Sequence, residues 1–183
     1  MIEEVDRHIV SKVFAHIEAQ PPGQGGPTCY FVNLSGITLG TPGFLDFIES
    51  ALAEFPSVCS SQICFEVTET AALSNIHRTA GAMRRLSEKG FRFALDDFGS
   101  GMASFSYLQN LPVQFVKIDG EFVKAVLDEP VSRIIVEAVT KVAHTMNMQT
   151  IAESVETYEL LPHLSTLGLD YAQGYALHMP APL

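Results

Sequence analysis

The sequence predicts an α/β fold built on parallel strands, and three observations carry that prediction. Six short apolar segments typical of buried strands alternate along the chain with segments of helical periodicity. Polar residues gather where these strands end, as they do in α/β proteins with a site at the carboxyl ends of the strands. The chain has 183 residues, 47% hydrophobic and 17% charged, which suits one domain with a sizeable core.

The first third of the chain is predicted to form a helix, a loop, a strand and a second helix. Val5–Ala19 has apolar residues at positions 5, 9, 13, 14 and 17, which is helical spacing. Proline and glycine residues over 21–27 predict a loop. Thr28–Leu34 (TCYFVNL) is typical of a buried strand, and Phe44–Phe55 reads as the next helix.

The middle third continues the alternation. Gln62–Glu69 (QICFEVTE) is the second predicted strand, and Ala71–Lys89 is predicted as one helix with apolar positions 73, 76, 80, 83 and 86 on one face. Gly90 supplies the stop signal for that helix. A third strand at Phe91–Asp97 (FRFALDD) and a short helical segment at Ser104–Gln109 follow.

The last third adds three strands and two helices. The strands are expected at Val113–Asp119 (VQFVKID), Gln149–Glu153 and Leu169–Tyr175. Val131–Met146 is predicted as a helix that buries positions 131, 134, 135, 138, 142 and 146, and Thr157–Leu167 as another. Strands separated in this way by helices favour parallel pairing through right-handed crossovers.

The strand ends carry the candidate chemistry. Their polar residues are Asn33, Glu66, Glu69, Asp96, Asp97, Lys117, Asp119, Glu153 and Gln173. Strand side chains alternate between two faces, so one face is apolar throughout and the other ends each time in a polar residue. If the strands close into a barrel, these residues converge on one mouth. Carboxylate and amide oxygens suit Mg²⁺, Mn²⁺ or Ca²⁺, and adjacent aspartates can serve two metals.

Each of these residues also has a purely structural interpretation. Asp97-Phe98-Gly99 is compatible with a simple turn capped by Asp97, and Glu69 with a favourable charge at a helix start. A kinase interpretation of Asp97-Phe98-Gly99 fails because the chain has no phosphate loop, strand lysine and HRD loop upstream. Repetition on successive strand ends favours a functional site over separate structural roles.

Charge and cysteine usage exclude several classes of protein. The net charge is −10, from 21 acidic and 11 basic residues, so a broad basic face for DNA or RNA is not expected. A phosphate-bearing ligand then requires metal ions to supply positive charge. Three cysteines without a CxxC spacing argue against a disulfide framework or zinc site and favour the cytoplasm. No apolar run approaches the ~20 residues of a membrane helix, so no membrane contact is expected.

The chain resembles the EAL domain, the bacterial phosphodiesterase of cyclic di-GMP. The matching segments are FVNLSG (31–36), FEVTET (65–70), ALDDFGSGMASFSYLQNLPVQFVKID (94–119), IAESVE (151–156) and AQGYAL (172–177). They span most of the chain, and the long segment from 94 to 119 is highly specific. Two positions depart from the family pattern: Met102 stands where an aromatic residue is common, and Ser154 where glycine is common.

The resemblance implies an incomplete TIM-like (β/α) barrel of the EAL type. About six parallel strands are expected, with the first two strands missing and residues 1–183 forming a single EAL domain fragment. The Glu-Ala-Leu signature is absent, although its glutamate is a metal ligand on one of the missing strands. The closing C-terminal helix of the family is also expected to be absent.

The resemblance further implies a two-metal site for Mg²⁺ or Mn²⁺ that opens cyclic di-GMP to linear pGpG. Lys117 would position the attacking water, Gln173 would assist, and Glu69 would hold the loop near 100–104. The implied metal ligands are Asn33, Glu66, Asp96, Asp97 and Glu153.

Three functional hypotheses follow. The first is a phosphodiesterase domain whose activity is impaired in this chain by the missing glutamate. The second is a catalytically inactive cyclic di-GMP receptor. The third, a domain for protein interaction that binds no nucleotide, is disfavoured by the complete set of downstream carboxylates. A homodimer through helices near the fourth and fifth strands, and a parent chain with sensor or GGDEF domains and a membrane anchor, are expectations from the family.

Overall fold

The computed structural model describes residues 1–20, 29–99 and 105–182. Their contacts divide the chain into two compact units, Met1–Phe93 and Ala94–Pro182, each of which is described by itself. The loop predicted at 21–27 lies outside the described residues, as does Ser104 at the start of a predicted helical segment.

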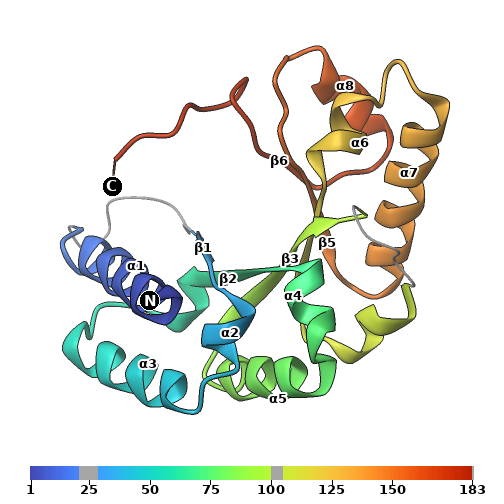
Figure 1. Ribbon diagram of the computed structural model, residues 1–183. Coiled ribbons are helices and arrows are strands. Elements are labelled where there is room, and N and C mark those ends of the chain that lie inside the picture. The colour runs from blue at the N-terminus through green and yellow to red at the C-terminus, as the bar shows by residue number, and fades with distance from the viewer. Residues whose placement is uncertain (21–28, 100–104, 183) are drawn as a thin grey trace. The chain divides into compact units, whose positions relative to one another are not determined.

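The first unit contains two parallel strands and five α-helices among its described residues (Figure 1). Strand β1 (Tyr30–Asn33) pairs with β2 (Ile63–Thr68), so that Asn33 lies opposite Glu66. The helices are α1 (Ile2–Glu18), α2 (Gly36–Leu39), α3 (Gly43–Glu54), α4 (Glu69–Ser74) and α5 (Ile76–Ser87), with a 3-10 turn at Ser60–Gln62. Both strands and α1 and α3 were predicted, whereas α2 is too short to show periodicity in the sequence.

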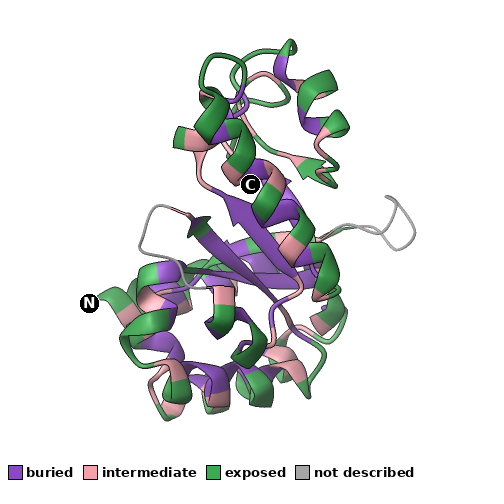
Figure 2. Ribbon diagram, turned by 90° about the vertical axis from the view of Figure 1, so that its right-hand side faces the viewer, coloured by how far each residue is buried: buried purple, intermediate pink, exposed green. Residues whose placement is uncertain are grey.

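An aromatic cluster forms the core of the first unit. The ring of Phe65 on β2 stacks on Phe91 at 5.3 Å and lies within 6.2 Å of Phe44. Figure 2 shows the strands largely buried. The apolar spacing of α1 marks its buried face only in part, because Val5 and Ile9 are exposed while Asp6 and Val10 are buried.

The prediction of one helix over Ala71–Lys89 is wrong, because the chain breaks at Asn75 into α4 and α5. Asn75 has φ −153°, outside the helical region, and its side-chain oxygen accepts a hydrogen bond from the amide of Arg78. The break rotates the helical faces, so Leu73 is exposed rather than buried. Gly90 follows with φ +95°, as expected for the glycine that ends a helix.

The described residues of the second unit form four parallel strands in chain order. They are β3 (Arg92–Phe98, which begins at the end of the first unit), β4 (Phe115–Ile118), β5 (Gln149–Ala152) and β6 (Tyr171–Ala172). The helices are α6 (Gly120–Lys124), α7 (Pro130–Thr145) and α8 (Leu160–Thr166), with a 3-10 segment at Phe105–Asn110. All four strands were predicted, whereas α6 was not.

Helix α7 buries a different face from the predicted one. Val131 and Ile134 are 67% and 64% exposed, although both were expected to be buried. The side that contacts β4 and β5 carries smaller residues instead: Ser132, Val136, Val139, Thr140 and Ala143. Two apolar stripes therefore run along α7, and the one with smaller side chains packs on the strands.

The six strands found among the described residues alternate with helices and run parallel to their partners within each unit, which confirms the predicted α/β class. Among the helices of the described residues, none has the length and apolar character that crossing a bilayer requires.

Candidate functional site

A bulge in β3 directs two adjacent carboxylates into one cluster. Leu95 pairs with Val116 and Phe98 with Ile118, so β3 holds one residue more than β4 between these pairs. Asp97 adopts φ +55° at that point. In a regular strand Asp96 and Asp97 would point to opposite faces, whereas here ligand oxygens of both, together with one of Glu153, lie within 4.8 Å of one another.

Lys117 bridges two of these carboxylates. Its ammonium nitrogen lies 2.8 Å from Oδ1 of Asp96 and 2.7 Å from Oε1 of Glu153, and its side chain is only 3% exposed. Strand order explains the meeting, because β4 carries Lys117 between β3 and β5. The structure therefore brings together four of the predicted site residues: Asp96, Asp97, Lys117 and Glu153.

The electrostatics of this cluster favour a cation. Burial, and to a smaller extent Asp96, outweigh the opposing effect of Lys117 and raise the pKa of Glu153 to about 7. Burial and then the charge of Asp96 also raise the pKa of Asp97. One ammonium thus faces three carboxylates. These closely spaced oxygens fit Mg²⁺ or Mn²⁺, which prefer hard oxygen ligands.

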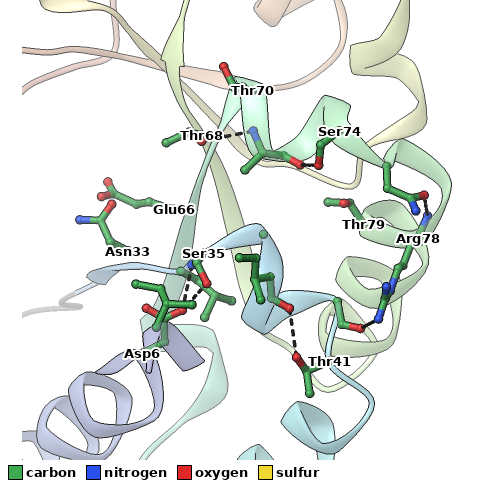
Figure 3. A pocket seen from close by; sticks show the side chains of 17 residues that line it. Asp6, Asn33, Ser35, Thr41, Glu66, Thr68, Thr70, Ser74, Arg78 and Thr79 are labelled. Atoms are coloured by element: carbon green, nitrogen blue, oxygen red, sulfur yellow. Dashed lines mark hydrogen bonds between the residues drawn. The ribbon is translucent and has the colours of Figure 1, made fainter. Parts of the chain in front are cut away.

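A second group of predicted residues lies in the first unit. Asn33 ends β1 directly opposite Glu66 on β2, and both line a pocket of about 840 Å³ (Figure 3). Glu66 is 6% exposed. Glu69 is 2% exposed and stands in the first turn of α4, which Thr68 caps. The structural role of Glu69 at a helix start is thus real, while its implied loop partner near 100–104 lies outside the described residues.

Gln173 directly follows β6, and its position connects it to Glu153. Its amide donates to the carbonyl of Ala152, the residue before Glu153. The side chains of Glu153 and Gln173 line one pocket of about 290 Å³, whose wall also contains Lys124 and Tyr175. This places Gln173 beside Glu153, one member of the acidic cluster.

Sequence reasoning missed the part played by Asp6. This residue of α1 is 7% exposed, and its Oδ2 accepts hydrogen bonds from the amide (3.1 Å) and the hydroxyl (2.6 Å) of Ser35 (Figure 3). Ser35 in turn caps α2, two residues after Asn33. An acidic residue in an early helical turn resembles an ordinary dipole partner, so the sequence offers no signal for this contact.

Comparison with known proteins decides the family. Residues 1–180 match the EAL domain. The chain belongs to the EAL domain family. It is 41% identical over its whole length to the cyclic di-GMP phosphodiesterase PdeB of Shewanella oneidensis, and 34% identical over 98% of its length to PdeA of Borreliella burgdorferi. It spans only 21% and 27% of the length of those two proteins.

Solved EAL structures agree with this assignment. A MucR phosphodiesterase in complex with c-di-GMP superposes with a TM-score of 0.86 at 29% identity, covering 98% of this chain and 71% of that one. The FimX EAL domain from Pseudomonas aeruginosa bound to c-di-GMP gives 0.88 at 27% identity, with the same two coverages. The predicted fold class, an incomplete TIM-like (β/α) barrel of the EAL type with six parallel strands, is confirmed.

Proposed function

We propose that this chain is a cyclic di-GMP phosphodiesterase domain that depends on divalent metal and opens its substrate to linear pGpG. The observation that carries the proposal is the cluster in which Lys117 contacts Asp96 and Glu153 beside Asp97. The similar proteins indicate the substrate, because the two relatives PdeB and PdeA are named cyclic di-GMP phosphodiesterases.

The proposed metal ligands are Asn33, Glu66, Asp96, Asp97 and Glu153, and the proposed ions are two Mg²⁺ or Mn²⁺. Bound divalent ions would offset the charge of the phosphodiester and activate a water for in-line displacement. The ammonium of Lys117 is suited to hold that water, because it is a buried hydrogen-bond donor that lies against Asp96 and Glu153. Gln173, in the same pocket as Glu153, would contact the ligand.

A receptor function is the second candidate, because the chain contains no Glu-Ala-Leu segment. The family resemblance assigns a metal ligand to that glutamate. Without it, the remaining carboxylates still offer oxygens to a cation, whereas two fully coordinated ions are not expected. We therefore propose that this chain binds cyclic di-GMP and hydrolyses it more slowly than a chain that includes the signature.

The test is an assay of the 183-residue protein with Mn²⁺ and cyclic di-GMP, with products separated by chromatography and binding measured by calorimetry. Slow conversion to pGpG that is lost in Asp97→Asn supports the phosphodiesterase. Binding without conversion supports the receptor. If the protein shows no binding and no conversion, both proposed functions are contradicted. Turnover equal to that of a chain carrying Glu-Ala-Leu would contradict the proposed impairment.

We also propose a homodimer through α7. Val131 and Ile134 on that helix, with Leu127 just before it, are 67%, 64% and 45% exposed, and such an apolar face suits a second copy of the same surface. Light scattering should give a dimer mass for the wild type and a monomer mass for Val131→Glu/Ile134→Glu. A monomeric wild type would contradict this proposal. Sensor or GGDEF domains in a longer parent protein, and a cytoplasmic location, remain proposals from the family.

A further inference from the structure

Gly120 and Ser154 form a contact that no larger side chain at position 120 would permit. A Cβ atom built on Gly120 would lie 2.5 Å from Oγ and 2.6 Å from Cβ of Ser154. Rotation about χ1 would move Oγ away but would leave the Cβ of Ser154 in place. An alanine at position 120 therefore requires a backbone shift at one of the two residues.

Ser154 can make that shift only together with its neighbours. Its φ is +52°, in the left-handed region that glycine favours. Val155, the next residue, is held by two backbone hydrogen bonds. Its amide donates to the carbonyl of Gln173 at 3.0 Å, and the carbonyl of Val155 accepts from the amide of Ala176 at 3.0 Å. A Cβ on Gly174 would lie only 2.3 Å from the backbone of Val155.

Glu153 is the residue that such a shift would displace. It precedes Ser154 directly, its amide donates to the carbonyl of Ile118 at 3.3 Å, and its carboxylate lies 2.7 Å from the ammonium of Lys117. A displacement of the backbone at 154 is transmitted through one peptide unit to this carboxylate. Metal and ammonium contacts depend on distances held to within a few tenths of an ångström.

We propose that Gly120 is a positioning residue for Glu153, acting through the side chain of Ser154, so that the serine at 154 obliges a glycine at 120. The proposal rests on the proposed function insofar as Glu153 is a metal ligand. The steric coupling between residues 120 and 154 stands without it. Once Ser154 loses its Cβ, the next contact of an alanine Cβ beyond its own helix and chain neighbours is, among the described residues, the carbonyl oxygen of Glu153 at 3.8 Å.

The experiment is a double-mutant cycle with Gly120→Ala, Ser154→Gly and the double variant. The readouts are the Kd for Mn²⁺ alone, by calorimetry, and the melting temperature. Gly120→Ala should raise the Kd about tenfold and lower the melting temperature by about 3–10 °C. In the Ser154→Gly background the same substitution should change the Kd less than about twofold. Gly81→Ala is the matched control, because outside its own helix a Cβ there meets no atom of the described residues within 4 Å.

Each result bears on the proposal. Rescue by Ser154→Gly supports it, including rescue of folding if Gly120→Ala alone does not fold. An equal effect of Gly120→Ala in both backgrounds, or no effect in either, overturns it. If the wild type binds no Mn²⁺, the proposed metal site fails. The melting temperatures then test the steric coupling between residues 120 and 154. Non-additive changes in melting temperature in the double variant support the coupling, and additive changes overturn it.

Discussion

The ammonium nitrogen of Lys117 lies 2.7 Å from Oε1 of Glu153. Lys117 is on β4, and Glu153 directly follows the adjacent parallel strand β5. The same nitrogen contacts Asp96 at 2.8 Å. A buried ammonium of this kind is stable only because carboxylates surround it. The surplus of negative charge that remains is what suits the cluster to a divalent cation.

Replacing Lys117 should separate catalysis from metal binding. Lys117→Met removes the group proposed to hold the water, so hydrolysis of cyclic di-GMP should fall by about 100-fold or more. The affinity for Mn²⁺ should not fall, because the two carboxylates lose the Lys117 ammonium as a competing cation. Steady-state rates and calorimetry measure the two effects. Lys141→Met, which removes an exposed pair with Glu137, is the control, and weaker Mn²⁺ binding in Lys117→Met would argue against this role.

Asp6 should contribute measurably to stability through Ser35. Asp6→Ala removes the acceptor of the Ser35 amide and one of the two acceptors of its hydroxyl, and it should lower the free energy of unfolding by about 1–3 kcal/mol. Asp6→Asn keeps an acceptor oxygen and should lose less. Urea denaturation checks both, with Glu4→Ala at an exposed site of the same helix expected within about 0.5 kcal/mol of wild type. Equal losses in Asp6→Ala and Glu4→Ala would refute the contact.

Asp170 should make stability depend on acid pH. Burial opposes its ionisation, but hydrogen bonds from His144 and from the amide and hydroxyl of Thr150 outweigh burial and place the pKa of Asp170 below its usual value. A lowered pKa in the folded state adds stability above the unfolded value of about 3.9, and this stability is lost as the pH falls through the folded pKa.

The variant Asp170→Asn tests that sign. The free energy of unfolding of the wild type should exceed that of Asp170→Asn by about 1 kcal/mol near pH 6, and this difference should shrink below about pH 4. Urea denaturation across this range measures it. Thr166→Val, which removes an exposed hydroxyl on α8, should retain the wild-type pH profile. A difference that stays constant down to pH 2.5 would show that the carboxylate does not titrate as described.

The break between α4 and α5 should depend on the side chain of Asn75. Asn75→Ala removes the acceptor for the amide of Arg78 and should cost about 1 kcal/mol of unfolding free energy. Ser74→Ala, one residue earlier, removes a hydroxyl at an exposed position and should stay within about 0.5 kcal/mol of wild type. If alanine at 75 stabilises the protein instead, the cap is not what holds the break.

Much of the strand framework was predictable from the sequence because buried strands and their polar ends leave strong local patterns. Alternation correctly separated buried Val32 from exposed Asn33 on β1. The third strand was located, but not its bulge, because an aspartate at φ +55° has no distinct sequence signature. That bulge is what gathers Asp96 and Asp97, so the detailed geometry of the cluster lay beyond the sequence.

The remaining errors share one cause, which is that helical periodicity does not say what covers a helix. On α7, Val131 and Ile134 form an apolar stripe as regular as the one that packs on the strands, yet they are exposed. On α1, the buried Asp6 occupies a position that looks solvent-exposed by composition. Tertiary partners decide both cases, and no local pattern encodes them.

The most direct test of the central claim is a titration of the protein with Mn²⁺, followed by electron paramagnetic resonance, for wild type and Asp97→Asn. If Asp96, Asp97 and Glu153 hold a metal ion, wild type should bind Mn²⁺ and the variant should bind at least about tenfold more weakly. Equal Mn²⁺ binding by the two proteins, or none by either, would contradict the account.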